Sequence, residues 1–177
     1  KEEADKAADQ SPSIEKVVVV RRLSREIPWN DERDVEWSSL MTGSSSVPAV
    51  ETNADDPFML IYTSGTTGRP KGTVHVHAGF PIKAASDAAY GMDVKPGDVL
   101  FWVTDMGWMM GPWMVFGALL SGATMLMYEG TPDYPEPDRL WKICANYGVT
   151  HLGISPTMIR ALMKFGDKWV ERHDLSK

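Results

Sequence analysis

The stretch FMLIYTSGTTGRPKG, residues 58–72, joins an apolar run to a segment rich in glycine and hydroxyl side chains. Residues 59–62 are apolar enough for a buried strand. The glycines at positions 65, 68 and 72 allow backbone with positive φ and a close approach to a ligand. A glycine-rich loop that directly follows a buried strand is the feature on which we base the interpretation of the whole chain.

This loop predicts an anion-binding site. Successive exposed N–H groups form a concave nest for oxyanions, hydroxyl side chains add donors, and Lys71 adds a full charge. Near a protein surface, that charge is worth about 4 kcal/mol against a unit charge about 4 Å away. A neutral hydroxyl contributes only about 1 kcal/mol net. We therefore expect Lys71 and the amides to dominate the binding of a polyphosphate, and the cations beside the glycines disfavour an ordinary polar surface loop.

The phosphate loop of nucleotide kinases is a competing interpretation. That loop has the pattern G-x-x-x-x-G-K-[ST], in which the final hydroxyl binds Mg²⁺. Counted from Gly65, this chain has Pro70 in place of the second glycine and Gly72 in place of the hydroxyl residue. Proline removes an N–H and glycine cannot bind a metal ion, so the sequence excludes a kinase-type loop.

Beyond the loop, apolar segments alternate with turn and cap signals. A helix is predicted over residues 78–90, because alanine and phenylalanine recur there every four residues. Asp138 is placed to cap a helix that ends at Gly148. Further strands are predicted at residues 99–103, 123–128 and 149–154, and further helices at 112–120 and from Ser155-Pro156 to Gly166. This alternation predicts an α/β fold, a layer built on a largely parallel sheet.

In open parallel sheets, ligands bind beyond the carboxyl ends of the strands. The loops after Tyr62, Val103 and Ile154 follow predicted strands, so we expect them at those ends. The first two contain the unusual residues, and we expect the functional site there.

Composition narrows the class of protein. The chain has 177 residues, a net charge of −6 and a single cysteine, Cys144. The mild acidity disfavours a nucleic-acid surface. No apolar run approaches the roughly 20 residues that span a bilayer, so we predict no membrane partner. One cysteine excludes an internal disulfide framework and is typical of a reducing compartment, which predicts a cytoplasmic protein.

The first part of the chain differs in composition from the α/β portion that follows it. Residues 1–15 are charged and alanine-rich, as in the end of a helix, and residues 17–20 form a β-branched run typical of a strand. Residues 24–56 are polar and broken by Gly, Pro and Ser, which predicts a long connector. We therefore expect residues 1–56 to form a strand plus a polar connector and 57–177 the α/β portion that binds nucleotide phosphates. The absence of a starting methionine suggests a portion of a longer protein.

Residues 62–72 match the phosphate loop of the adenylate-forming (AMP-binding) superfamily of acyl-CoA synthetases, luciferases and peptide-synthetase adenylation domains. Further stretches resemble the acetyl-CoA synthetase branch, in order and at fitting distances: VKPGD at 94–98, DMGW at 105–108, YEGTPDYP at 128–135 and SPT at 155–157. The resemblance covers roughly residues 12–175. It implies the layered, largely parallel sheet of an acyl-CoA synthetase N-terminal domain.

Such enzymes join a carboxylic acid to ATP, giving acyl-AMP and pyrophosphate, and then pass the acyl group to the thiol of coenzyme A. The resemblance implies that the loop holds the β- and γ-phosphates of ATP through Thr63, Ser64, Gly65, Thr66, Thr67, Gly68 and Lys71. The implied ligands are ATP, coenzyme A and a small carboxylic acid, with Mg²⁺ bound by a residue outside this chain. No catalytic residue and no metal ligand is expected within it.

By the same resemblance, Trp108 lines the acyl pocket near the pantetheine tunnel, with Met109, Met110 and Gly111 after it. A core tryptophan is the alternative, but Gly107 and Gly111 bracket it as in a tight functional loop. The acetate-using pattern has valine and threonine where this chain has Met109 and Met110. Methionine is longer and more adaptable, so the pair could shrink the pocket or flex around a longer acid. We expect a short or small aliphatic acid.

The remaining reactive side chains are interpreted as structural. The carboxylate is already ionised near neutral pH, so its attack needs no general base. We therefore predict capping or packing for His75 and His77, and the sequence around His151 and His173 carries no signal of a function. Cys144 is predicted to lie on the inner face of a helix as a small hydrophobe rather than as a nucleophile.

Several parts of such an enzyme are missing from this sequence. The resemblance implies a Gly-Glu-Pro segment that contacts adenine shortly after Lys177, then the Mg²⁺-binding glutamate and a C-terminal domain with a catalytic lysine. We therefore expect part of an AMP-forming acid–CoA ligase that is inactive alone. The alternative is a non-catalytic nucleotide- or polyphosphate-binding module. Adenylation for a carrier protein is disfavoured by the acetyl-branch stretches.

Overall fold

A computed structural model describes residues 1–177 except Ser24, Thr42, Ser44, Ser45 and residues 65–67. The described chain divides into two compact units, Lys1–Val50 and Glu51–Lys177. Each is considered by itself below. Among the described residues, no helix has both the length and the apolar character that crossing a membrane requires.

The first unit contains helix α1 (Glu2–Asp9), strands β1 (Val17–Val19) and β2 (Asp34–Glu36), and the short helix α2 (Trp37–Leu40). The two strands pair in parallel, with Val18 opposite Val35. The predicted helix and the predicted strand are confirmed. The prediction of a connector over residues 24–56 is wrong in part, because β2 and α2 lie within it.

A network of ion pairs holds this unit together around Asp34, whose side chain is fully buried. Lys1 Nζ lies 2.8 Å from Asp34 Oδ2 and also pairs with Asp5. Arg33 binds Asp5 at 2.5 Å and Asp9 at 2.7 Å. The charged residues of α1 are therefore tied to the start of β2, a link between distant residues that hydrophobic periodicity does not reveal.

The second unit begins with an antiparallel hairpin of β3 (Pro57–Thr63) and β4 (Lys71–Val76), followed by α3 (Phe80–Ser86), which continues into a π-helical turn, Asp87–Gly91. Strand β4 was not predicted. The helix predicted over residues 78–90 exists, but it begins two residues later and widens at its end.

The rest of this unit alternates strands and helices as predicted. Its elements are β5 (Val99–Trp102), α4 (Met110–Leu120), β6 (Thr124–Leu126), α5 (Arg139–Tyr147), β7 (His151–Gly153), α6 (Pro156–Met163) and the 3₁₀ turn Asp167–Trp169. The three strands form a parallel sheet in the order β6-β5-β7. The predicted α/β fold with a parallel sheet is confirmed.

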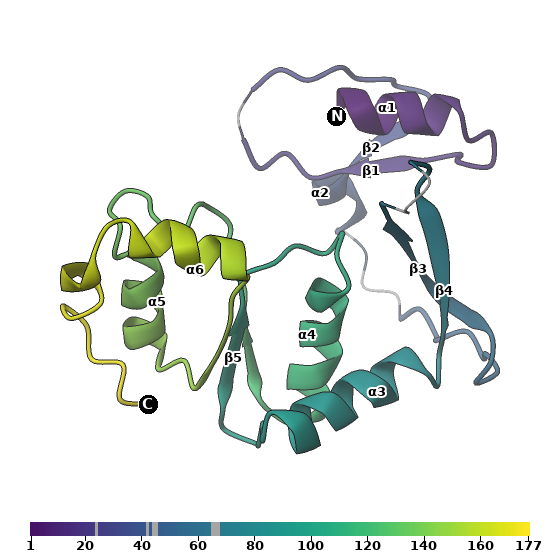
Figure 1. The fold of residues 1–177 in the computed structure, drawn as a ribbon. Coiled ribbons are helices and arrows are strands. Elements are labelled where there is room, and N and C mark those ends of the chain that lie inside the picture. Colours follow the sequence, from purple (N-terminus) through teal and green to yellow (C-terminus); the bar gives the residue numbers. More distant parts are fainter. Residues whose placement is uncertain (24, 42, 44–45, 65–67) are drawn as a thin grey trace. The chain divides into compact units, whose positions relative to one another are not determined.

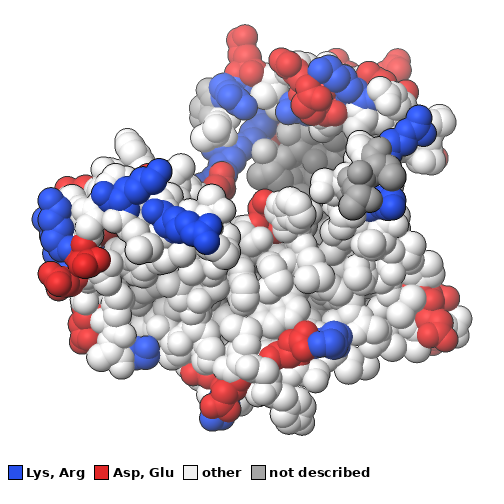
Figure 2. All heavy atoms as spheres, viewed as in Figure 1, with Lys and Arg blue, Asp and Glu red and all other residues white. Residues whose placement is uncertain are grey.

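Two apolar clusters cover the two faces of this sheet. Neighbouring residues on β5 point to opposite faces, so Leu100 belongs to a cluster with α3 and α4, and Phe101 to a cluster with α5 and α6. Figure 1 shows these helix pairs on either side of β5. Helix α4 contains no charged residue, and Figure 2 shows a largely uncharged surface in the middle of this unit.

The start of α5 corrects one prediction. Asp138 occupies the N-cap position, but its side chain makes no capping hydrogen bond. Its Oδ2 instead lies 3.0 Å from Nε2 of His173, a residue that the sequence left without a role. This pair attaches the C-terminal segment to the start of α5. At the other end, Gly148 takes the left-handed conformation predicted for a helix stop, with φ of 58°.

Candidate functional site: a glycine-rich hairpin loop and an apolar pocket

The predicted phosphate loop connects β3 to β4. Thr63 and Lys71 face each other across the hairpin as direct partners in the register. Directly opposed residues of an antiparallel pair project from the same face, so a hydroxyl and an ammonium group flank the loop on one side. Of the other predicted phosphate contacts, Ser64 and Gly68 are described, whereas Gly65, Thr66 and Thr67 lie outside the described residues.

The described part of the loop has the backbone of a glycine turn. Gly68 has φ of 80°, a conformation that side chains of L-residues rarely adopt, and the position where a Cβ would stand has no atom within 4 Å. The space beside the backbone is therefore open, as the binding of an anion by main-chain amides requires. At the base of the loop, a Cβ on Gly72 would lie 3.3 Å from the Tyr62 ring. The Tyr62 ring therefore packs against the backbone of Gly72, its partner across the hairpin.

An apolar pocket of about 600 Å³ lies at the carboxyl ends of β5 and β7. Its lining comes from three segments: residues 102–105, which include the last residue of β5; residues 108–110, which lead into α4; and residues 154–156, between β7 and α6. Two of the three loops expected at the carboxyl ends of strands thus meet in one pocket, whereas the loop after Tyr62 belongs to the separate two-stranded sheet of the hairpin.

The structure brings Trp108, Met109 and Met110 together in this pocket. Trp108 is 57% exposed and Met109 is 50% exposed, so neither is a core side chain. Within this chain, Trp108 therefore lies outside both apolar clusters, and its place in an acyl pocket stays a prediction. Gly111 does not line the pocket but lies in the first turn of α4, where it is buried.

Asp105 shapes the loop that presents these side chains. Its Oδ1 accepts a hydrogen bond from Gly107 N at 2.6 Å, and its carbonyl oxygen accepts one from Trp108 N at 3.3 Å. A further turn follows, in which Gly111 N donates to the Trp108 carbonyl at 3.1 Å. The chain thus folds back tightly between β5 and α4, and only the absence of a side chain at Gly111 leaves room for the Asp105 carbonyl.

Sequence reasoning missed part of the pocket lining. Trp102, Ile154, Ser155 and Pro156 contribute to it as well. The Ser155-Pro156 pair was predicted to start a helix, which is confirmed, since Ser155 Oγ accepts from Met158 N at 3.2 Å. The loop after Ile154 was expected at a carboxyl end of the sheet, but the functional site was assigned to the loops after Tyr62 and Val103, so this pair was not included among the site residues. For Trp102, no sequence signal showed on which side its indole ring lies.

The histidines pack against aromatic rings or form hydrogen bonds, and the cysteine is buried. His75 packs against Phe80 with ring centroids 5.0 Å apart, and His77 packs against Phe58 at 5.3 Å. The packing role predicted for both is confirmed. Cys144 is buried, and burial raises the pKa of its thiol to about 11, so it stays protonated near neutral pH. His151 contacts the Met92 carbonyl and Thr150, and His173 pairs with Asp138; no sequence signal pointed to either contact.

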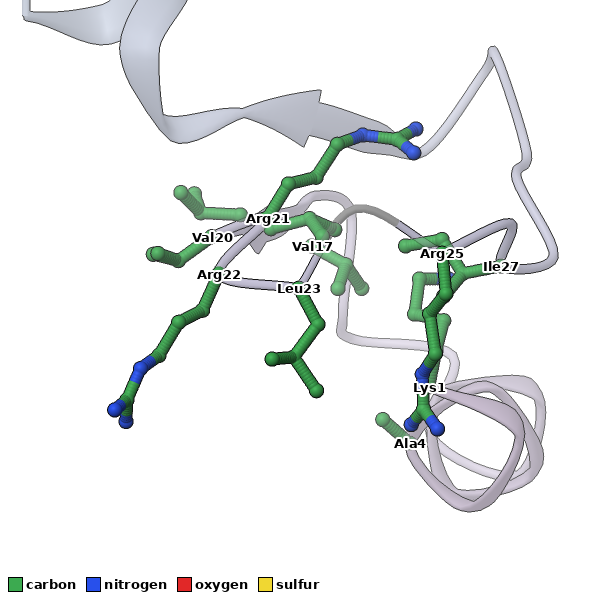
Figure 3. A pocket seen from close by; sticks show the side chains of 11 residues that line it. Lys1, Ala4, Val17, Val20, Arg21, Arg22, Leu23, Arg25 and Ile27 are labelled. Carbon is green, nitrogen blue, oxygen red and sulfur yellow. The ribbon is translucent and has the colours of Figure 1, made fainter. Parts of the chain in front are cut away.

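The first unit has a hollow of its own, of about 350 Å³. Figure 3 shows it between the side chains of Val17, Val20 and Leu23, with Lys1 and Arg25 at one side beside α1. None of the predicted site residues lines it. Among the described residues, no group of three or more His, Cys, Asp or Glu side chains is arranged to bind a metal ion.

Comparisons with known proteins agree with this architecture. The chain is 42% identical over 174 residues to the acetyl-coenzyme A synthetase of Syntrophus aciditrophicus, covering 97% of this chain and 27% of that protein. It is 44% identical over 178 residues to the acetyl-coenzyme A synthetase of Rubrobacter xylanophilus, covering 99% and 28%. The structure matches acetoacetyl-CoA synthetase from Streptomyces lividans with a TM-score of 0.82 and 32% identity, covering 98% of this chain and 27% of that one.

The chain therefore spans little more than a quarter of the length of these relatives. The family model described as AMP-binding enzyme matches residues 1–177. The superfamily indicated by the phosphate-loop sequence is thus confirmed, and this chain belongs to the AMP-binding enzyme family.

Proposed function

We propose that this chain is the phosphate-binding and acid-binding part of an AMP-forming acid–CoA ligase. The full-length protein would use ATP to convert a small carboxylic acid to acyl-AMP, release pyrophosphate, and transfer the acyl group to the thiol of coenzyme A. Relatives named acetyl-coenzyme A synthetase support both the acid and the thiol acceptor. The lone reduced cysteine supports a reducing compartment, and we place the protein in the cytoplasm.

The observation that carries this proposal is the paired Thr63 and Lys71 on either side of the glycine loop. A carboxylate attacks an α-phosphorus that is already surrounded by negative oxygens, so the protein must neutralise charge and hold the reactants in line. Lys71 would neutralise the β- and γ-phosphates that leave as pyrophosphate. The amides and hydroxyls of residues 63–68 would orient them.

The pocket of Trp108, Met109 and Met110 would hold the tail of the acid. Its indole and thioether walls favour a hydrocarbon tail over a charged one. Mg²⁺ would supply further charge neutralisation at the phosphates, and we assign its ligand to residues of the full-length protein beyond these 177. Binding and orientation, rather than proton transfer, are the tasks left to this chain.

ATP–pyrophosphate exchange in the full-length protein tests the role of the loop. We expect Lys71→Ala to lower exchange at least about tenfold more than Thr63→Val, because a charge near phosphate is worth several times a hydroxyl. Lys83→Ala removes an exposed lysine of α3, far along the chain from the loop, and serves as the control. Equal losses for Lys71→Ala and Thr63→Val would contradict this role.

The isolated 177 residues give a second test. We expect them to support no acyl-CoA synthesis, while the full-length protein does. A full-length protein that binds ATP but exchanges no pyrophosphate with any acid would favour the alternative, a non-catalytic nucleotide-binding module.

A further inference from the structure

Trp102 and Gly153 form an unusual pair in the parallel sheet. They are direct partners in the register of β5 and β7. The three atoms nearest to a Cβ on Gly153 all belong to the Trp102 indole ring, and all lie well inside the 3.0 Å that real Cβ atoms respect. The indole ring therefore lies across β7, directly over the bare backbone of Gly153.

The side of the indole ring that faces the core is already filled. Trp113 of α4 packs edge-on against it, with ring centroids 5.3 Å apart and an interplanar angle of 67°. Trp113 is itself buried in the cluster that includes Leu100 and Met114. Protein cores are close-packed, so the ring has no room to move in that direction.

The indole ring also borders the pocket that we assign to the acid. Trp102 lines this pocket, together with Trp108, Met109 and Ile154. Gly153 is not among the lining residues, so it acts on the pocket only through the ring that covers it. A side chain at position 153 would displace the indole ring, and the pocket is an open space beside that ring.

We propose that Gly153 sets the size of the acyl pocket by allowing the Trp102 ring to lie flat over β7. This inference rests on the proposed function and refines its substrate class. With the ring held aside, the pocket takes aliphatic acids longer than acetate. Gly153 and Trp102 are specificity-determining residues of the ligase, not catalytic ones.

The test compares kcat/KM for acetate, propionate, butyrate and hexanoate in the full-length protein, measured by ATP–pyrophosphate exchange. A hydrophobic pocket discriminates a single methylene by roughly 10–200-fold. We expect Gly153→Ala to lower the butyrate-to-acetate ratio by at least about tenfold and to leave the KM for ATP unchanged. Trp102→Leu should raise the same ratio, and it tests the proposal even where Gly153→Ala fails to fold.

Two further variants sharpen the result. Gly91→Ala is the matched control, since a Cβ there meets no atom within 4 Å and the residue is exposed; it should leave the ratio unchanged. The double variant Gly153→Ala/Trp102→Leu should recover the use of butyrate, because the clash is with the indole ring.

The outcomes separate this inference from the proposed function. A wild-type protein that exchanges pyrophosphate with acetate alone overturns the inference and leaves the ligase assignment intact. The inference is also overturned if Gly153→Ala and Trp102→Leu each lower kcat/KM by the same factor for every acid, because that would show that the two residues support the fold and do not select the acid. No exchange with any acid would overturn the ligase assignment, and the inference with it.

Discussion

Gly111 occupies the first turn of α4, where the chain passes over the carbonyl group of Asp105. A Cβ at this position would lie well within 3.0 Å of the Asp105 carbonyl oxygen, which belongs to the backbone and cannot turn aside. In an unconstrained helix, alanine is favoured over glycine by about 1 kcal/mol. Overpacking typically costs about 1–3 kcal/mol, and more where backbone must shift. We expect the clash to outweigh the gain in helix propensity.

Gly111→Ala should therefore lower the melting temperature of the full-length protein. The matched control is Gly107→Ala in the same loop. A Cβ at position 107 would meet only the Asp105 Oδ1 atom, at 2.9 Å, and a carboxylate side chain can rotate away. Thermal unfolding of the two variants checks the prediction, and an equal or smaller loss for Gly111→Ala would show that the loop yields more easily than its hydrogen bonds suggest.

The residues around the pocket differ in how far sequence could predict them. Gly107 and Gly111 marked a tight loop, because two glycines that bracket bulky side chains favour a backbone that turns sharply around them. The contact between Trp102 and Gly153 could not be predicted, since it depends on which residue of β7 pairs with which residue of β5. The hydrophobic pattern specifies a register only where one face of a strand is apolar and the other polar, and Val99–Trp102 is apolar on both faces.

At the scale of elements, α6 and α5 begin in different ways. Ser155 Oγ accepts a hydrogen bond from Met158 N, and Pro156 takes the first helical position, where its missing N–H costs nothing. Asp138 has the residue type of a cap but its carboxylate binds His173. Both positions have cap-type residues in the sequence, but only the one without a competing tertiary partner makes the capping bond.

Removing the cap of α6 should have a defined energetic cost. We expect Ser155→Ala to lower the free energy of unfolding by about 1 kcal/mol, the usual value for a lost N-cap. Ser155→Asn should keep most of the stability, because its side chain can accept the same bond. Denaturant unfolding of the full-length variants provides the measurement, and an identical loss for both substitutions would indicate that Ser155 acts through the pocket rather than through the helix.

The Asp138–His173 pair leads to a separate prediction. His173→Ala leaves a buried carboxylate without this partner, so we expect the segment after α6 to separate from α5. Hydrogen exchange in residues 167–177 should accelerate, whereas exchange in β5 should not change. Protection that persists in that segment would show that Asp167–Trp169 is held mainly by other contacts.

Among the elements, alternation of strands and helices was predictable and β4 was not. The parallel sheet follows from apolar segments separated by helical ones, a pattern that leaves little choice of topology. Strand β4 begins at Lys71, inside the glycine-rich motif. Because the motif was interpreted as a loop, the β-branched residues that follow, Thr73, Val74 and Val76, were not recognised as a strand. Those residues are the signal that could have identified it.

At the scale of the whole molecule, the two units are stabilised by different forces. Glu51–Lys177 contains two apolar clusters. Lys1–Val50 relies on Asp34, which lies between Lys1 and Arg33 and also accepts a hydrogen bond from Asn30 N. The hydrogen bond from Lys1 lowers the pKa of Asp34 below its ordinary value of 3.8. The first unit should therefore be the more sensitive of the two to acid.

The stability that Asp34 contributes depends on pH, because its pKa differs between the folded and the unfolded chain. A carboxyl group whose pKa is lowered by folding stabilises the folded state at every pH above its unfolded value. That stability disappears as the pH falls from 3.8 through the folded pKa, because the protonated group no longer attracts Lys1 and Arg33. Asp98 in the second unit also has a lowered pKa, first from the hydrogen bond donated by Lys95 N and then from Thr150, but these contacts lie at the edge of a unit held by two apolar clusters.

Hydrogen exchange followed by mass spectrometry at about pH 6 and about pH 3 distinguishes the two units in one sample. We expect protection of β1 and β2 to fall in acid, relative to intrinsic exchange, while β5 and β7 stay protected. Asp34→Asn should lower the protection of β1 already at about pH 6 and remove most of its further loss in acid, because no carboxylate remains to titrate there. Asp98→Asn is the matched control and should leave β1 unchanged. Equal acid sensitivity of the wild type and Asp34→Asn would show that other carboxylates, such as Asp5 and Asp9, govern the acid response of this unit.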